Sequence, residues 1–341
     1  MKATRFTTLT LAADLVTGIV HWLEEYRPRP MNPLLFVRGL FTATLALVFS
    51  GCATVNRVAV NKLGDALAGG GTVYASDNDP ALIRDAAPFS LKLMESLLAS
   101  TPDHSGLRLA AAGGFTQYAY AFVQQEAEAL EDTDVAAAAV LRARACRLYL
   151  RGRDHGLRGL ESAHHGFGDS LRHSPRQAVQ TCVRPDVPLL YWTAAAWVSA
   201  IATGKDQPEL IADLPVVEAL IDRALELDEA YDHGAIHAFL TAYELSRPGG
   251  TGDPLMRSRA HYERALALTG GAHAGPLLTY AENVCVRQQD RTQFESLLHQ
   301  ALAIDPDAKP EWRLVNLVLQ ARARRLLGHA DDLFLASTPV N

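Results

Sequence analysis

The sequence predicts an all-α fold in which tetratricopeptide-like antiparallel helix hairpins stack into a compact repeat array. After Cys52, apolar residues recur every three or four positions, which is the period of an amphipathic helix. No segment there alternates apolar and polar residues for long enough to indicate a strand. Clusters of Gly, Pro and Asp separate the helical segments, as in Arg247-Pro248-Gly249-Gly250, and these residues favour turns.

The expected helix boundaries follow from capping and breaking residues. Asp79 before Pro80 indicates a helix start, because Asp accepts hydrogen bonds from free backbone amides and Pro fits the first turn. Pro102 indicates the end of this helix. Further helices are expected at about 105–131, 134–161, 175–183, 187–203, 208–227, 232–246, 253–268, 275–287, 291–304 and 310–328, with a loop at Ser162–Ser174.

Similar sequences at three helix ends indicate a weak repeat. They are centred on Ala224, Ala265 and Ala301, which are 41 and 36 residues apart, whereas the tetratricopeptide period is about 34. A small residue lets two helices approach closely, and stacked pairs bury apolar faces that a single pair leaves exposed. Generic antiparallel helix pairs would give a similar pattern, and this alternative stays open.

An uncharged apolar run, followed by small residues and a cysteine, lies near the N-terminus. Leu40–Phe49 has only ten residues, whereas a bilayer span needs about 20. Ser50 and Gly51 are typical of a signal-peptide cleavage site. Cys52 directly after them is similar to the lipidated cysteine of bacterial lipoproteins, so Cys52 is expected to carry lipid. A buried apolar segment with a chance cysteine is the alternative.

Residues 1–51 are therefore expected to be an N-terminal extension plus a lipoprotein signal peptide, and residues 52–341 a helical repeat domain. A leader of 51 residues exceeds the usual length of about 15–30. Met31 is a better start, because Met31–Gly51 has 21 residues and contains Arg38 as its positive charge. A long leader that begins at Met1 is the alternative.

Composition and motifs narrow the functional classes. The net charge of −6 and the lack of a long basic run argue against nucleic acid as a partner. The sequence has no nucleophile elbow, no paired zinc-protease histidines and no phosphate-binding loop, so we expect no enzyme and no cofactor. Four histidines at 155, 164, 165 and 173 lack a recognisable ligand spacing, so no metal site is expected. With Cys52 lipidated, Cys146, Cys182 and Cys285 allow at most one disulfide.

A stripe of arginines is the first candidate binding surface. Arg144, Arg147, Arg151 and Arg158 recur at helical spacing. Guanidinium groups suit carboxylates, whether these belong to a ligand or to a partner protein. A solvated helix face is the alternative interpretation.

Two aromatic groups are the second candidate. Phe115, Tyr118 and Phe122 form a stripe on one expected helix, and Trp192 and Trp197 lie on an alanine-rich helix further along the chain. Core packing is the default explanation for such groups. The alternative is an apolar ligand cleft, which aromatic side chains commonly line.

Several motifs, in order along the chain, carry a family resemblance. They are Val73–Pro80, Ala87–Lys92, Gly114–Val123, Arg147–Asp154, Leu190–Trp197, Gly234–His237 and Thr279–Glu282. Together they resemble the T component of TRAP transporters over roughly Cys52–Phe334. The resemblance implies a periplasmic lipoprotein of tetratricopeptide-like hairpins, a homotrimer with a cleft in each protomer, no catalysis, and association with the periplasmic solute-binding protein of a TRAP system.

The expected function is that of a lipid-anchored accessory binding protein for TRAP-type solute uptake. It would associate with the solute-binding protein and hold an apolar or carboxylated ligand. The outer membrane is the expected site of the anchor. The alternative function is a lipoprotein scaffold, built of helical repeats, for envelope protein assembly.

Overall fold

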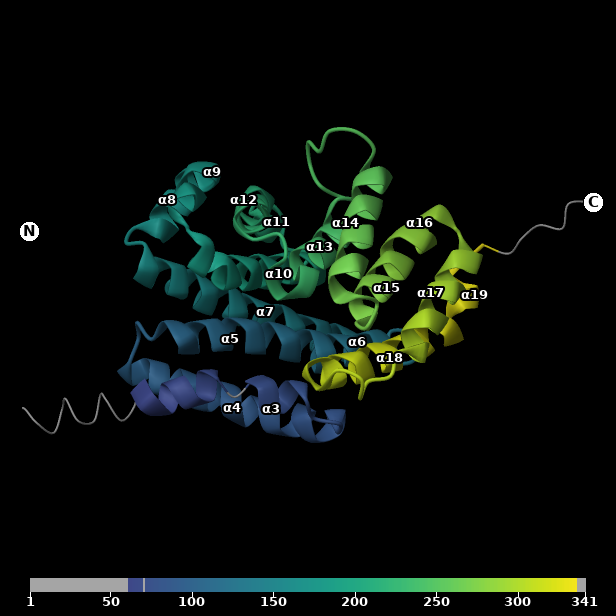
Figure 1. Ribbon diagram of the computed structural model, residues 1–341, viewed down its shortest axis with the longest axis horizontal. Coiled ribbons are helices and arrows are strands. Elements are labelled where there is room, and N and C mark those ends of the chain that lie inside the picture. The colour runs from purple at the N-terminus through teal and green to yellow at the C-terminus, as the bar shows by residue number, and fades with distance from the viewer. Residues whose placement is uncertain (1–60, 70, 336–341) are drawn as a thin grey trace, which may run out of the picture. The chain divides into compact units, whose positions relative to one another are not determined.

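The computed structural model describes residues 61–69 and 71–335, all of which belong to the compact unit Ala59–Asn341. Every regular element in these residues is a helix, and none is a strand (Figure 1). The all-α prediction is therefore confirmed. The predictions for Cys52, Met31 and the leader 1–51 fall outside the described residues.

The first half of the described chain contains the longest helices. Residues 61–68 are helical and precede the labelled elements. These are α3 (Gly71–Ala75), α4 (Pro80–Ser100), α5 (Ser105–Tyr118), a π-helical segment η1 (Ala119–Gln124), α6 (Gln125–Leu130), α7 (Val135–Ala163), α8 (Phe167–His173), α9 (Pro175–Ala178), 3₁₀ turns η2 (Val179–Thr181) and η3 (Arg184–Asp186), and α10 (Val187–Thr203).

Shorter helices make up the second half. They are α11 (Pro208–Ile211), α12 (Leu214–Leu227), α13 (Tyr231–Tyr243), α14 (Pro254–Thr269), α15 (Ala274–Tyr280), a second π-helical segment η4 (Ala281–Cys285), α16 (Val286–Gln288), α17 (Arg291–Ala303), the 3₁₀ turn η5 (Pro310–Trp312), α18 (Arg313–Gly328) and α19 (Ala330–Leu333). Across all described residues, no helix is both long enough and apolar enough to cross a membrane.

Asp79 caps α4 as the sequence predicts, and three further aspartates cap other helices. The Asp79 carboxylate accepts hydrogen bonds from the amides of Ala81 and Leu82 at the start of α4, each over 3.0 Å. Asp134, Asp253 and Asp290 cap α7, α14 and α17 in the same way. These bonds satisfy amides that have no partner within the helix.

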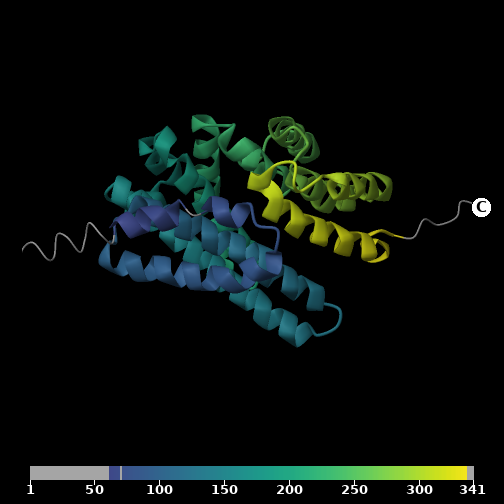
Figure 2. The same ribbon diagram turned by 60° about the horizontal axis from the view of Figure 1, so that its bottom comes forward.

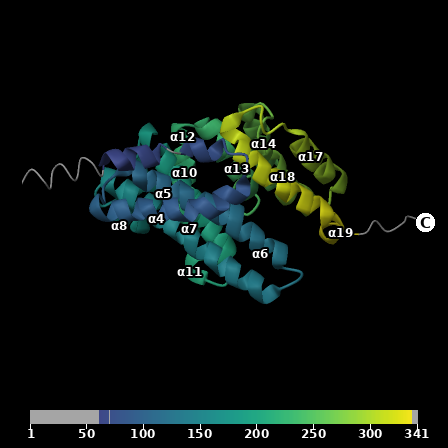
Figure 3. The ribbon, with the colours of Figure 1, turned by 90° about the horizontal axis from the view of Figure 1, so that it is seen from below.

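Helix α7 packs between α5 and α10, with α4 beyond α5 and α12 beyond α10 (Figure 1). Glycines on α7 permit this close approach. A methyl group added at Gly156 would lie 2.1 Å from Thr193 Oγ1 on α10, and one added at Gly152 would lie 3.0 Å from the Ala112 carbonyl on α5. The turn from α6 into α7 extends past the neighbouring helices (Figure 3).

Two apolar cores hold the helices together. The N-terminal core runs from Leu91 on α4 to Tyr243 on α13, and the C-terminal core from Ala274 on α15 to Phe334. Helices α17 and α18 carry much of the second core and lie to one side of the N-terminal helices (Figure 2). Tyr120 packs against both cores.

The three repeat alanines occupy the contacts that the sequence predicted for them. Ala224, Ala265 and Ala301 have no exposed surface. They lie near the ends of α12, α14 and α17, where a larger side chain would separate the packed helices. The tetratricopeptide-like stacking itself stays a prediction.

The expected loop at Ser162–Ser174 is wrong in part, because it contains α8. Gly166 has a positive φ of 78°, which glycine adopts without strain, and it turns the chain into α8. The Glu161 carboxylate then accepts hydrogen bonds from the amides of Gly166 and Gly168, at 2.7 and 2.8 Å. Phe167 and Leu171 are buried, and their apolar burial stabilises this short helix.

The helix expected at 232–246 begins differently from the prediction. Asp232, His233 and Gly234 all have positive φ values, so the right-handed helix starts only after them. Gly234 approaches α14 so closely that an added methyl group would lie 3.3 Å from the Ala265 Cα. Positive φ at two consecutive non-glycine residues is strained, and such strain concentrates at functional sites.

Candidate functional site

Arg151, the central arginine of the predicted stripe, contacts a carboxylate and an aromatic ring. Its guanidinium forms a two-point ion pair with Glu95 on α4. Its Cζ atom lies 5.1 Å from the centroid of the Phe115 ring on α5, a cation–π distance. The structure therefore brings Phe115 and Arg151 together, and Glu95 occupies the arginine fork.

His155, one helical turn after Arg151, completes this cluster. Its ring stacks on Phe115 with centroids 5.7 Å apart and an interplanar angle of 6°. Its Nδ1 lies 3.1 Å from Arg108 Nη1, and its Nε2 lies 3.2 Å from Glu95 Oε1. Because arginine can only donate, Nδ1 accepts and Nε2–H donates to the carboxylate. We call Glu95, Arg108, Phe115, Arg151 and His155 the Glu95 cluster.

The Glu95 cluster alters the ionisation of its carboxylate. Burial by itself would raise the pKa of Glu95, but hydrogen bonds from Arg151, Lys92 and His155 outweigh it and lower the pKa to about 2. Burial also lowers the pKa of His155, which favours the neutral imidazole. The cluster thus holds one fixed negative charge between two guanidinium groups and a neutral histidine.

The Glu95 cluster should make the fold sensitive to acid. The pKa of Glu95 is lower in the folded chain than the ordinary 4.5, so protonation favours unfolding. Its contribution is complete above pH 4.5 and is lost as the pH falls toward about 2. Urea unfolding across this range should show a smaller loss of stability in Glu95→Gln than in the unchanged protein. Equal acid dependence in the two proteins would exclude this role for Glu95.

The other three arginines of the stripe face solvent. Arg144, Arg147 and Arg158 are exposed on α7. Within the described residues, none of them forms an ion pair. The predicted stripe therefore divides into one arginine held by Glu95 and three guanidinium groups that are accessible from outside.

The predicted aromatic residues do not form one surface. Tyr118 is buried and packs on Phe122, with ring centroids 5.7 Å apart. Trp197 is buried, and its Nε1–H donates to Asp213 over 3.1 Å. Arg153, on α7, covers the Trp197 ring at 4.9 Å. These three aromatics serve chiefly as packing groups.

Trp192 belongs to a different aromatic group. Its ring lies against Gly113 of α5 and meets Tyr191 edge-on at 5.0 Å. Tyr191 also contacts Tyr231, with centroids 5.4 Å apart. All three rings are only half-buried, although burial raises the pKa of both tyrosines. Side chains that lie deep in the fold and keep accessible surface can contact a ligand, and we call these three the tyrosine–tryptophan group.

The strained first turn of α13 adjoins this group in the sequence. Asp232 follows Tyr231 directly, and its charge also raises the pKa of Tyr191 and Tyr231. Burial raises the pKa of Asp232 itself. The acidic side chain of Asp232 disfavours binding of a carboxylated ligand against these rings. An apolar ligand is compatible with it.

Both π-helical segments contribute to a charged network between the two cores. Tyr120 comes from η1 and Glu282 from η4. Arg322 on α18 pairs with Glu282 over 2.5 Å, pairs with Glu128 on α6, and lies 5.7 Å from the Tyr120 ring. Arg325 joins Glu128 at 3.1 Å. The carboxylates outweigh burial and raise the pKa of Arg322, so the guanidinium stays charged.

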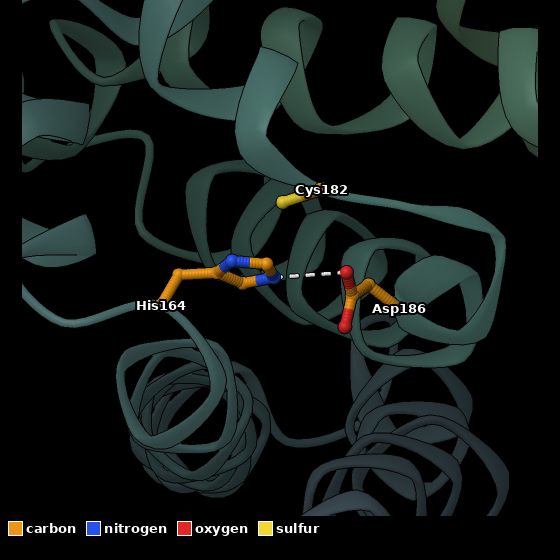
Figure 4. Close-up of side chains that lie close together, drawn as sticks. All are labelled: His164, Cys182 and Asp186. Atoms are coloured by element: carbon orange, nitrogen blue, oxygen red, sulfur yellow. Dashed lines mark hydrogen bonds and ion pairs between the residues drawn. The ribbon is translucent and has the colours of Figure 1, made fainter. Parts of the chain in front are cut away.

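One cluster in the described residues has the donor atoms of a metal site. His164, Cys182 and Asp186 each offer one ligand atom, and these atoms all lie within 4.8 Å of one another (Figure 4). In the sequence, no carboxylate or cysteine lies at a recognisable ligand spacing from His164. Cys182 and Asp186 follow His164 by 18 and 22 residues and approach it only through the fold.

Comparison with known proteins identifies the family. A family profile described as TRAP transporter T-component matches residues 76–334. This chain belongs to the TRAP transporter T-component family. A protein of Treponema pallidum (strain Nichols), described as uncharacterized, is 32% identical over 269 residues, which cover 77% of this chain and 83% of that protein.

Membership in the TRAP transporter T-component family confirms the resemblance found in the sequence and fixes the broad function. The family is a transport accessory and not a known enzyme family. Its members are associated with TRAP transport systems and with the cell envelope, at a periplasmic location. The matched region includes the Glu95 cluster, the tyrosine–tryptophan group and both π-helical segments.

Proposed function

We propose that this chain is a lipid-anchored periplasmic protein that associates with the solute-binding protein of a TRAP-type uptake system. The single observation that carries this proposal is the family match over residues 76–334. Lipidation of Cys52 supplies the anchor, because the two acyl chains of one diacylglycerol meet the requirement of about two lipid chains for stable membrane attachment. The outer membrane is the proposed location, and a homotrimer is the proposed assembly.

The proposed contact with the solute-binding protein uses Arg144, Arg147 and Arg158. Their exposure on α7 supports this choice, because exposed guanidinium groups are accessible to an acidic partner. They attract that partner and orient it as it approaches. Arg151 is already paired with Glu95 and contributes to the fold of this face. Charge complementarity of this kind acts mainly on the association rate and weakens at high salt.

The proposed ligand is apolar and lies against the tyrosine–tryptophan group. The half-buried rings of Tyr191, Trp192 and Tyr231 support this placement. Asp232 beside them argues against a carboxylated ligand at the same place. Phe115, Tyr118, Phe122 and Trp197 then support the surrounding fold.

Crosslinking in intact cells tests the anchor and the partner together. The solute-binding protein of the TRAP system should be crosslinked to the unchanged protein, and the crosslinked product should sediment with membranes. Cys52→Ser should lose membrane attachment and the matching lipid mass while the folded domain persists. Normal membrane retention of Cys52→Ser would exclude lipidation at Cys52. Failure to crosslink the solute-binding protein, with the chain correctly located, would contradict the proposed association.

A further inference from the structure

Three segments that are separate in the sequence converge on one small site. His164 directly follows α7, Cys182 directly follows η2, and Asp186 is the last residue of η3 (Figure 4). His164 Nε2 and Asp186 Oδ2 are 2.9 Å apart, and the Cys182 thiol lies close to both. The site lies outside the Glu95 cluster, the tyrosine–tryptophan group and the exposed arginines.

Cys182 differs from the other two free cysteines in what its thiol faces. The thiols of Cys146 and Cys285 lie within hydrogen-bond distance of amide-type oxygens, those of Ala200 and Gln293. The Cys182 thiol is fully buried and faces an imidazole and a carboxylate. Burial and the Asp186 charge raise the pKa of Cys182 to about 11, so the thiol is neutral without a cation.

We propose that His164, Cys182 and Asp186 bind a Zn²⁺ ion through Nε2, Sγ and a carboxylate oxygen. Imidazole and thiolate together suit zinc, whereas magnesium and calcium prefer oxygen ligands alone. Zinc bonds of about 2.0–2.3 Å place tetrahedral ligand atoms about 3.3–3.8 Å apart. The present separations, between 2.9 and 4.8 Å, bracket that range, so modest side-chain rotations complete the site.

Backbone groups around the site hold two of the proposed ligand residues in place. The amide of Val183 donates to Asp186 Oδ2 over 2.8 Å, which orients the carboxylate. Arg223 Nη2 donates to the Cys182 carbonyl over 2.9 Å, which fixes the cysteine backbone. Hydrogen bonds of this kind, from groups that do not bind the metal themselves, orient the residues that do.

An open pocket of about 520 Å³ adjoins the site and gives a route for the ion. His164 lines this pocket together with His165, Asp169 and His173. Three protein ligands leave one tetrahedral position, which water from the pocket can occupy. His165 and His173, the two exposed histidines of the pocket, are alternative ligands for the same metal. The experiment must therefore distinguish binding at these two histidines from binding at the proposed site.

Zinc binding at this site requires one proton to leave. The S–H bond of Cys182 breaks, a Zn–S bond forms, and the proton goes to solvent. The Nε2–H proton of His164 moves to Nδ1, which leaves Nε2 free to bind the ion. One proton is therefore released for each ion bound, and no electron is transferred.

Cobalt titration of the purified full chain tests the proposal, with zinc competition and proton release measured alongside. Co²⁺ bound to a thiolate gives a near-ultraviolet charge-transfer band that histidines alone do not give. The unchanged protein should show this band at one ion per chain, lose it on adding Zn²⁺, and release one proton per Zn²⁺. Cys146→Ser is the matched control and should behave like the unchanged protein, because that thiol lies elsewhere.

The variants decide between the proposed site and the two pocket histidines. Cys182→Ser should abolish the band, and His164→Gln should weaken zinc binding at least tenfold. The double variant His165→Gln/His173→Gln should retain both the charge-transfer band and the zinc affinity of the unchanged protein. A missing band in the unchanged protein, a band that persists in Cys182→Ser, or zinc binding lost only in His165→Gln/His173→Gln would overturn the proposal. His164→Gln alters a partly exposed side chain, and it remains decisive if Cys182→Ser does not fold.

Discussion

Replacing Arg322 with Met should destabilise the fold by about 3–5 kcal/mol, because it removes one partner of a largely buried ion pair. Arg322 pairs with Glu282 and Glu128, and its ring contact with Tyr120 lies between the two cores. Methionine replaces much of the apolar stem of Arg322. It leaves the largely buried Glu282 carboxylate without its cationic partner. Urea unfolding followed by circular dichroism measures the loss.

Arg324→Met is the control for Arg322→Met, because Arg324 lies on the same helix and is exposed. It should change stability by less than about 0.5 kcal/mol. Equal stability losses in the two variants would contradict a specific role for the network of Arg322. A double variant, Arg322→Met with Glu282→Gln, should recover part of the loss, because the unpaired carboxylate is then removed.

Replacing Gly156 with Ala should also destabilise the protein, by about 1–3 kcal/mol, because the added methyl overfills the contact between α7 and α10. The new Cβ would lie 2.1 Å from Thr193 Oγ1 and 3.4 Å from the Thr193 backbone. An exposed helical Gly→Ala change would instead stabilise by up to about 1 kcal/mol. The two effects have opposite signs, and urea unfolding therefore distinguishes them.

Gly328→Ala is the matched control, because a methyl group there meets no atom within 4 Å. It lies at the end of α18 and should be neutral or slightly stabilising. Thr193→Ala combined with Gly156→Ala should restore part of the lost stability, since it removes the hydroxyl that the methyl contacts. A Gly156→Ala protein as stable as the unchanged one would show that α7 and α10 can separate without cost.

Local sequence features predicted where several of the helices begin. Asp79, Asp134 and Asp253 begin helices in the structure as capping chemistry predicts. The repeat alanines Ala224 and Ala265 are buried where the spacing placed them. The sequence did not reveal α8, whose first turn is held by hydrogen bonds to Glu161 in the folded chain. It also did not reveal the left-handed start of α13, where Gly234 packs against α14.

The candidate sites were less accessible to sequence reasoning. The sequence offered Arg151 and Phe115 as candidates on separate helices, and the structure places them in contact. Their partner Glu95 lies 56 residues before Arg151, and no spacing rule connects the two. Glu282 lies in η4 and Arg322 lies 40 residues later on α18, so no spacing rule connects these two partners either. For buried charges such as Glu95, a useful signal is an isolated acidic residue within an otherwise apolar helical face.

Association with the TRAP solute-binding protein is the central claim, and sedimentation velocity with both purified proteins tests it most directly. We predict a saturable complex whose affinity falls at least tenfold in Arg144→Glu/Arg147→Glu/Arg158→Glu and is unchanged in Arg172→Glu. The control replaces an exposed arginine on α8, which does not belong to the α7 stripe. An absence of complex formation between the two folded proteins at every attainable concentration would contradict the account.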